Sequence, residues 1–266
     1  MRKLLVAATA AAFCAAPALA ADMPTKAAPA PAVWNWSGFY AGIGVGWSHN
    51  GFKDSWGITD NFLQAGSSAD PHSDGVAGSI TIGAQQQYNN MIVGLEASYL
   101  GFANKAAQRL FATQPPCTFA GPNGGAPCGV EDYAHGTFTI TPRLGLAMDR
   151  TLWYIKGGYA ETKVNEREVN CCTNAAALAN PFVTPWDDSQ SNSWHGGWVL
   201  GGGVQWAWTN HIILGIDYQH IEISSKTANT VLNCHNAACA FSPPLFGQVR
   251  VGGNLDVVQA TLTFKN

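Results

Sequence analysis

Eight segments in which apolar residues alternate with small or polar residues constrain this chain more than any other feature. In the first, five apolar residues from Phe39 to Trp47 alternate with Tyr40 and three glycines. Side chains alternate between the two faces of a strand, so each segment predicts a β-strand with one apolar face. Pro142 in the fourth segment cannot donate a ladder hydrogen bond and predicts a bulge or a weak point. The other seven segments cover residues 76–85, 93–99, 137–146, 153–159, 198–208, 212–219 and 258–264.

The connections between these segments alternate in length. Short connections follow the second, fourth and sixth segments, at Tyr88–Met91, Met148–Thr151 and Thr209–His211, and the others are long. Soluble barrels have no reason for this asymmetry, which is typical of bacterial outer-membrane barrels. The pattern predicts an all-β fold, an eight-stranded antiparallel up-and-down transmembrane β-barrel with short periplasmic turns and long extracellular loops. With an even strand number, both termini are expected to be periplasmic.

The second face of the strands distinguishes this prediction from a soluble barrel with an apolar interior. That face consists of Gly, Ala, Ser, Thr and Gln with few charges, and only 12% of the whole chain is charged. Such a face fits a narrow lumen better than a surface exposed to water. The apolar face carries aromatic residues where the two girdles of a membrane barrel belong. They are Trp153, Trp206, Trp208 and Phe264 near the short turns, and Trp47, Tyr99, Tyr159, Trp198 and Tyr218 near the long loops.

The N-terminal residues predict export. Arg2 and Lys3 precede an apolar run that ends in Ala18-Leu19-Ala20, which is typical of a signal peptide cleaved after Ala20. The expected organisation is a signal peptide at 1–20, a Pro/Ala-rich periplasmic linker at 21–35 and the barrel at 36–266. The net charge of -3 provides no basic field, so no nucleic-acid partner is expected.

Short motifs in a fixed order resemble the small porin-family outer-membrane β-barrels of alphaproteobacteria, relatives of the outer-membrane protein A transmembrane domain. Among them are Trp36-Ser37-Gly38-Phe39-Tyr40-Ala41-Gly42, Gly94-Leu95-Glu96-Ala97 and Tyr154-Ile155-Lys156-Gly157-Gly158-Tyr159-Ala160. The resemblance implies an integral outer-membrane protein that depends on the barrel-assembly machinery. Lipid and lipopolysaccharide are its expected partners, and a structural role in the envelope is its expected function.

Two positions depart from the pattern of these relatives. Their chains usually end in an aromatic residue that the assembly machinery recognises, whereas here Phe264 is followed by Lys265 and Asn266. Phe264 is expected to supply that cue from two positions earlier. Charged lumen positions of the relatives are occupied here by Gln205 and Gln259, which predicts a weaker interior charge network.

Four charged residues on the inward face predict a plugged lumen. Eight strands enclose a space that side chains fill, and the four charges sum to zero. Antiparallel pairing places Glu96 opposite Thr141 to Arg143, and Arg143 opposite Lys156. Two adjacent cations need carboxylates nearby, which Glu96 and Asp217 can provide. We therefore expect an ion-pair network of Glu96, Arg143, Lys156 and Asp217. The alternative is that the same groups are hydrated in a narrow solute channel.

Six cysteines follow the signal peptide, and all are expected in the long connections. Export through an oxidising compartment favours disulfides over zinc. Pairing within a loop is simplest for Cys117 with Cys128 and for Cys234 with Cys239. A bridge between the adjacent Cys171 and Cys172 would be strained, so these two are candidates to link loops, and the connectivity stays open.

The chain is not expected to be an enzyme. His195 near Ser193 and His72 beside Ser73 have no carboxylate on the same strand face that would complete a triad. No cofactor and no metal site are predicted. His49, His72 and His235, expected in loops, leave a haem-binding, ligand-binding or adhesive surface as a further alternative.

Overall fold

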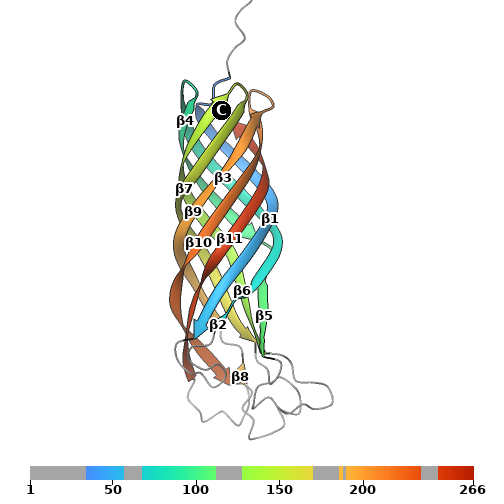
Figure 1. Cartoon of the computed structure of the whole chain (residues 1–266), viewed down its shortest axis with the longest axis vertical. Helices are drawn as coiled ribbons and strands as arrows, with labels where there is room; N and C mark the ends of the chain where they lie inside the picture. The colour runs from blue at the N-terminus through green and yellow to red at the C-terminus, as the bar shows by residue number, and fades with distance from the viewer. Residues whose placement is uncertain (1–33, 57–67, 112–127, 170–185, 188–189, 235–244) are drawn as a thin grey trace, which may run out of the picture. The chain divides into compact units, whose positions relative to one another are not determined.

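Eight long antiparallel strands and three short ones make up the described part of the chain (Figure 1). The computed structural model describes residues 34–56, 68–111, 128–169, 186–187, 190–234 and 245–266. The long strands are β1 (Gly38–Trp56), β3 (His72–Tyr88), β4 (Met91–Phe102), β6 (Cys128–Met148), β7 (Thr151–Val169), β9 (Gln190–Ala207), β10 (Ile212–Cys234) and β11 (Leu245–Lys265). The short strands β2 (Ser68–Ala69), β5 (Ala106–Phe111) and β8 (Trp186–Asp187) pair with β1, β6 and β10.

The eight long strands close into a ring. Each pairs with its neighbour in the order β1-β3-β4-β6-β7-β9-β10-β11, and β11 pairs back with β1 from Tyr40 opposite Lys265 to Trp56 opposite Val249. Because β1 and β11 pair with each other, no strand of the ring has an unpaired edge. A sheet in a lipid environment requires this. The predicted antiparallel up-and-down barrel is therefore confirmed.

The three short turns lie where the sequence predicts them. Two of them contain two residues each, between β3 and β4 and between β6 and β7. Their first residues, Asn89 and Asp149, have φ angles of 55° and 51°. Asn and Asp tolerate this left-handed conformation better than other non-glycine residues, which suits them to tight hairpins.

The strands extend further than the alternating apolar pattern predicts. β10 has 23 residues and β11 has 21, whereas only β4, with 12, is close to the expected length. The additional residues form what we call the distal extension, the part of the barrel beyond the aromatic residues at the edge of the apolar alternation, Trp47, Tyr99, Tyr159, Trp198 and Tyr218. Most outward positions there are polar, so the apolar alternation ends although the strands continue.

Several residues that the sequence analysis expects in loops lie in strands of the distal extension. His49 and His72 lie in β1 and β3, and Cys128 and Cys234 lie at the start of β6 and the end of β10. Pro142 marks a weak point of the ladder and not a bulge. Thr141 and Pro142 have no partners in β7, but the register is the same on both sides of this gap, because a proline removes a hydrogen bond without inserting a residue. The register shift of β6 against β7 lies between Ala134 and Gly136.

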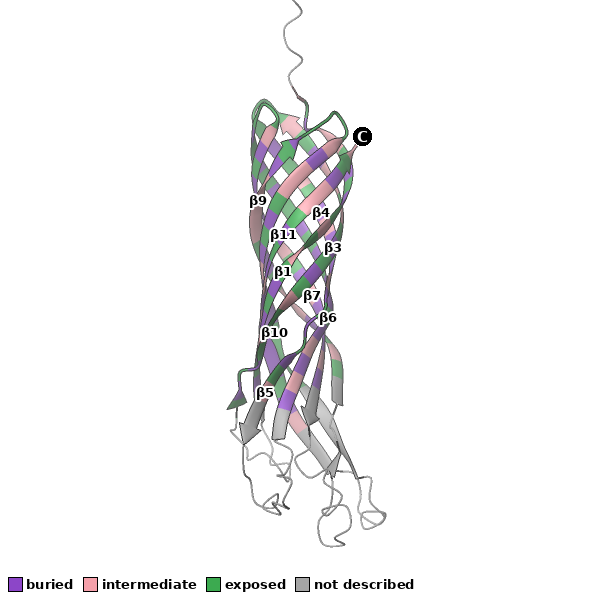
Figure 2. Cartoon of the chain, turned by 90° about the vertical axis from the view of Figure 1, so that its right-hand side faces the viewer, coloured by how far each residue is buried: buried purple, intermediate pink, exposed green. Residues whose placement is uncertain are grey.

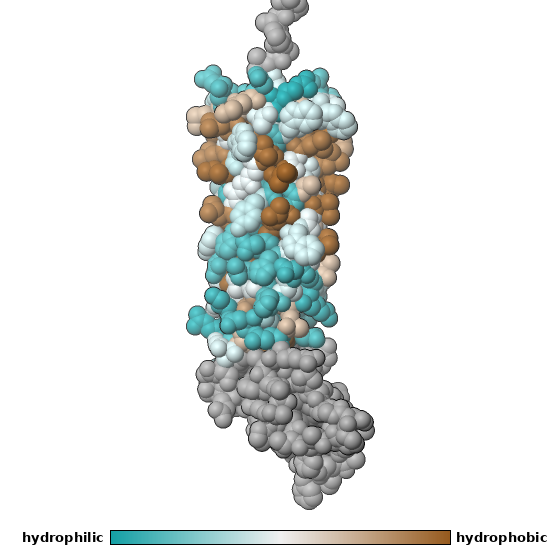
Figure 3. Space-filling view, turned by 45° about the vertical axis from the view of Figure 1, so that its right-hand side comes forward, coloured by the Kyte–Doolittle hydropathy of each residue, from teal (hydrophilic) through white to brown (hydrophobic). Residues whose placement is uncertain are grey.

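Burial alternates along the strands, and the exposed residues of the short-turn half form an apolar belt (Figures 2 and 3). The belt contains Ile43, Ile80, Ile82, Leu95, Leu144, Ile155, Leu200 and Ile216, each more than 40% exposed. A continuous exposed apolar band around a closed barrel is what a lipid-facing surface requires. Among the described residues, no helix has the length and apolar character needed to cross a membrane.

Candidate functional site: the barrel lumen

The structure brings the four predicted lumen charges together inside the barrel. Glu96 on β4, Arg143 on β6, Lys156 on β7 and Asp217 on β10 all face inward and are at most 5% exposed. Their position follows from the register, which places Glu96 opposite Thr141 and Arg143 opposite Lys156 as predicted. Glu96 and Arg143 therefore lie on adjacent strands, whereas Lys156 reaches Glu96 and Asp217 across the lumen.

Short contacts connect the four charges in a chain across the lumen. Arg143 Nη1 lies 3.1 Å from Glu96 Oε2, and Lys156 Nζ lies 2.8 Å from Glu96 Oε1. Lys156 Nζ also lies 3.0 Å from Asp217 Oδ2. Each cation thus has a carboxylate partner, and the cluster has no net charge. Buried charges are tolerated when they are paired and hydrogen bonded in this way.

Two tyrosines complete the cluster. Tyr40 donates its hydroxyl to Glu96 and accepts from Arg143, at 2.9 Å in both cases. Tyr154 donates to Asp217 Oδ2 at 2.6 Å. The guanidinium carbon of Arg143 lies 4.0 Å from the centre of the Tyr154 ring and 5.4 Å from that of Tyr40, both within cation–π range.

Glycines opposite the tyrosines make room for their rings. Gly83 is the direct cross-strand partner of Tyr40, and Gly203 is that of Tyr154. A Cβ atom at Gly83 would collide with the Tyr40 ring, and one at Gly203 would lie 2.7 Å from the Tyr154 hydroxyl. The sequence places both tyrosines on the inward face, but the alternation alone does not indicate that they contact the charges.

Gln205 and Gln259 belong to the network as hydrogen-bond partners of its charged groups. Gln205 accepts a hydrogen bond from Arg143 Nη2 at 3.1 Å, and Gln259 donates to Asp217 at 3.3 Å. Ser79 of β3 donates to Gln259 at 2.6 Å, and Gln219 donates to Asp217 at 2.7 Å. All eight long strands therefore contribute to what we call the ionic layer: Tyr40, Ser79, Glu96, Arg143, Tyr154, Lys156, Gln205, Asp217, Gln219 and Gln259.

The ionic layer leaves almost no free space. The cavity that remains among Tyr40, Glu96, Lys156 and Asp217 has a volume of about 20 Å³. A single water needs roughly 10–15 Å³ of such volume. The free space at this level is therefore about that of one water molecule.

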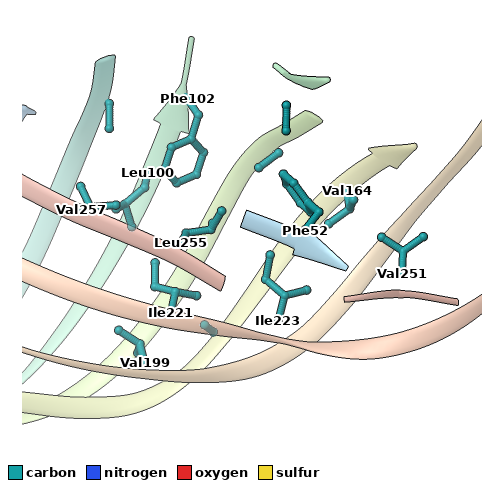
Figure 4. Close-up of a cluster of buried hydrophobic side chains, with 14 of the residues drawn as sticks. Phe52, Leu100, Phe102, Val164, Val199, Ile221, Ile223, Val251, Leu255 and Val257 are labelled. Atoms are coloured by element: carbon teal, nitrogen blue, oxygen red, sulfur yellow. The ribbon is translucent and has the colours of Figure 1, made fainter. Parts of the chain in front are cut away.

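A second, apolar layer fills the lumen on the long-connection side of the ionic layer (Figure 4). Leu100 lies four residues after Glu96 on β4, and Ile221 lies four residues after Asp217 on β10. This apolar layer contains Phe52, Ala77, Leu100, Phe102, Ala134, Ala160, Val164, Val199, Ile221, Ile223, Val251, Leu255 and Val257, all buried. The sequence analysis missed it, because in the distal extension inward apolar residues alternate with outward polar ones, the reverse of the pattern in the belt.

All nine predicted girdle residues are exposed on the outer face. At the long-connection end, Tyr159 and Trp198 are direct cross-strand partners, and Trp47 and Tyr218 both pair with Val258. The aromatic side chains thus form rungs at the edge of the apolar belt, which is the place of a membrane–water interface.

Histidine–carboxylate pairs lie just beyond this aromatic rung. His49 Nδ1 is 2.8 Å from Asp74, and His220 Nδ1 is 2.8 Å from Asp256. Within the described residues, no group of three or more His, Cys, Asp or Glu side chains is arranged to hold a metal ion. His235 and Cys117, Cys171, Cys172 and Cys239 lie outside the described residues, so the predicted disulfides involve positions that the structure does not describe.

Ser193 and His195 form the hydrogen-bonded pair that the sequence suggested. Ser193 Oγ lies 2.8 Å from His195 Nε2, and His195 Nδ1 lies 3.4 Å from the carbonyl oxygen of Ser224. Burial lowers the pKa of His195, which favours the neutral imidazole. The group facing Nδ1 is a main-chain carbonyl, not the carboxylate of a Ser-His-Asp triad.

The comparisons with known proteins agree with this geometry. The family model of the outer membrane protein beta-barrel domain matches residues 6–242. The chain belongs to this family. The 31 kDa outer-membrane immunogenic proteins of Brucella melitensis and Brucella suis are each 29% identical over 264 residues, covering 96% of this chain and 99% of theirs. This outer-membrane barrel therefore has full-length relatives in alphaproteobacteria, as its motifs indicate.

Two solved structures share the fold of this barrel. The outer membrane protease OmpT from Escherichia coli has a TM-score of 0.53 and 10% sequence identity, covering 86% of this chain and 97% of that chain. OprG from Pseudomonas aeruginosa has a TM-score of 0.50, also at 10% identity, with the same two coverages. At this identity the likeness shows the fold alone.

Proposed function

We propose that this outer-membrane barrel is closed to solutes and serves to anchor its long connections at the cell surface while contributing to the integrity of the envelope. The proposal includes cleavage after Ala20, periplasmic termini and short turns, and contact with lipid and lipopolysaccharide. Assembly by the barrel-assembly machinery and bridging of the loop cysteines belong to the same proposal. Its support is the family, the apolar belt and the interior of the barrel.

The observation that carries the proposal is that two barriers lie in series in the lumen. The ionic layer has room for about one water, and the layer beyond it is lined mainly by aliphatic side chains, with buried Asn50 and Ser48 opposite Leu255 and Val257. Transfer of a charge into such an apolar constriction is costly, and constrictions of this kind can exclude water altogether. A narrow solute channel would require both layers to open together.

Single-channel recording in a planar bilayer tests the closure. Four chains are compared: wild type, Arg143→Ala in the ionic layer, Ile221→Ser with Leu255→Ser in the apolar layer, and all three changes together. Ile221 and Leu255 are fully buried cross-strand partners, so both substitutions act at one level of the lumen. Leu144→Ala is the matched control for Arg143→Ala, because Leu144 is adjacent and faces outward.

We expect no openings from the wild type, from Leu144→Ala or from either single-layer variant, and measurable conductance from the triple variant. Steady openings of the wild-type chain would overturn the proposal. They would favour the narrow-channel alternative, with the four charges acting as a selectivity filter. Conductance from Arg143→Ala alone would show that the apolar layer is no barrier.

A further inference from the structure

The barrel wall opens between β9 and β10 in the distal extension. Pairing of these strands runs from Ala207 opposite Ile213 to Gly197 opposite Ile223 and then ends. Beyond this point β9 continues along β7, whereas β10 continues along β11 after a register shift between Ile223 and Lys226. The two strands therefore separate beyond Gly197, toward the long-connection end.

A surface hollow of about 530 Å³ lies at this opening. Its walls include Tyr159 and Trp198, which are half exposed, and the exposed residues Ser225 and Lys226. Gly196 leaves it open, since a Cβ there would lie 3.1 Å from the Tyr159 hydroxyl. The hollow thus combines aromatic walls with a hydroxyl and an ammonium group.

Lys226 is held at the opening and keeps hydrogen-bonding capacity. Its Nζ donates to the carbonyl oxygen of Trp194 across the separation of the strands, at 3.1 Å. An ammonium group has three donors, so two remain for a ligand. Lys163 of β7 lies directly opposite Trp194 of β9. A second cation is therefore beside the exposed Trp194 indole. Two acids are also near, because Glu161 pairs with Gly196 and Glu222 pairs with Trp198.

Two other strands carry acids on their outward faces at the edge of the apolar belt. On β3 and β11 the outward residues next to the aromatic rung are Asp74 and Asp256, each within 2.8 Å of a histidine. Tyr218 also donates to Asp256, at 2.6 Å. An anion approaching from the membrane interface therefore meets two carboxylates on β3 and β11, whereas at the opening it meets Lys226 and Lys163 beside the two acids named above.

The height of the hollow indicates what would occupy it. Tyr159 and Trp198 form the aromatic rung at the edge of the apolar belt, and Trp194 lies four residues further out on β9. Four residues of a strand span roughly 13 Å, less when the strand is tilted. The hollow is therefore at the level of lipid head groups, where an exposed cationic pocket binds phosphates and aromatic faces cover sugar rings or acyl stems.

We propose that this hollow is a binding site for a phosphorylated sugar head group of lipopolysaccharide. The phosphate contacts Lys226 and Ser225, with Lys163 adding attraction, and the sugar lies against Tyr159 and Trp198. The inference rests on the orientation given under the proposed function, in which the long-connection end faces the outer leaflet. It does not depend on the closed lumen.

Binding of lipopolysaccharide to the purified full-length chain in zwitterionic detergent micelles tests the site. The variants are Lys226→Gln, Lys163→Gln and Gly196→Leu, which fills the hollow without changing a charge. Lys53→Gln is the matched control, an exposed lysine in the distal extension of β1. We expect Kd to rise about tenfold for Lys226→Gln and about threefold for Lys163→Gln, with no change for Lys53→Gln. Gly196→Leu is expected to weaken binding at least tenfold.

Two further probes separate possible sources of the phosphate. Dephosphorylated lipopolysaccharide is expected to bind at least tenfold more weakly than the native glycolipid, and millimolar inorganic phosphate is expected not to compete. Equal binding of the dephosphorylated form, or equal affinities of Lys226→Gln and Lys53→Gln, would overturn the site. Displacement by inorganic phosphate alone would show a free-phosphate site instead of a glycolipid site. Conductance of the same protein samples reports separately on closure of the lumen.

Discussion

Two glycine–tyrosine pairs shape the lumen at the scale of single residues. Tyr40 and Tyr154 each lie over the glycine directly opposite on the neighbouring strand, and their hydroxyls bind the carboxylates that neutralise Arg143 and Lys156. A side chain at either glycine would push the ring out of the ionic layer. Large and small residues on opposite strands therefore make the charged core compact.

Gly83→Val tests this role. We expect the free energy of unfolding to fall by about 2–4 kcal/mol, because the Tyr40 ring must move and leave buried charges without a hydrogen-bond partner. The measurement is urea unfolding of the barrel in lipid vesicles. Gly78→Val is the control on the same strand, since Gly78 faces outward and a Cβ there has no neighbour closer than 3.8 Å. Equal losses for both variants would contradict a specific contact with Tyr40.

At the scale of elements, the distal extension contains a group of buried acids. Asp132 on β6 lies directly opposite Glu166 on β7, and both are buried, as is Asp54 on β1. Burial raises the pKa of Asp132 to about 7; the hydrogen bond with Asp54 opposes this and the charge of Glu166 adds to it. On β6, Asp132 lies six residues from Phe138 toward the long-connection end, outside the apolar belt. It can therefore exchange protons with water when the extension opens.

The raised pKa predicts that the distal extension becomes less stable as pH rises. Between about pH 4 and pH 7, folded Asp132 keeps a proton that the unfolded chain has released, so stability falls across this window, by up to about 4 kcal/mol. Hydrogen exchange of β6 amides, corrected for intrinsic rates, should show protection falling over that range. Asp132→Asn should remove the dependence, whereas Glu131→Gln, the neighbouring acid, should retain it. A wild-type profile without this slope would contradict the prediction.

At the scale of the whole molecule, the closed ring places an apolar belt between aromatic rungs, with polar strands continuing beyond it (Figure 3). The depth of a residue in the membrane therefore decides which side chains its outward position tolerates. On β1 this boundary falls within a few residues, since Ile43 is in the belt and His49 lies beyond Trp47.

Substitution with arginine at these two outward positions measures that boundary. Ile43→Arg should lower the free energy of unfolding in vesicles by about 2–4 kcal/mol, because the charge lies near the bilayer midplane. His49→Arg should change it by less than about 1 kcal/mol, since Asp74 remains as a partner within reach. Similar costs at both positions would contradict the placement of the belt.

The sequence by itself determined the barrel, its short turns, the outward aromatic residues and the register that puts Glu96, Arg143 and Lys156 side by side. Those features follow from period-two alternation, a local property of each strand. Only the tertiary structure decided how inward side chains meet across the lumen. The roles of Gln205, Gln259 and the two tyrosines, the apolar layer and the opening beside Lys226 depend on strands far apart in the chain. Alternation shows which face a residue occupies, but not which residues share a height inside a closed ring.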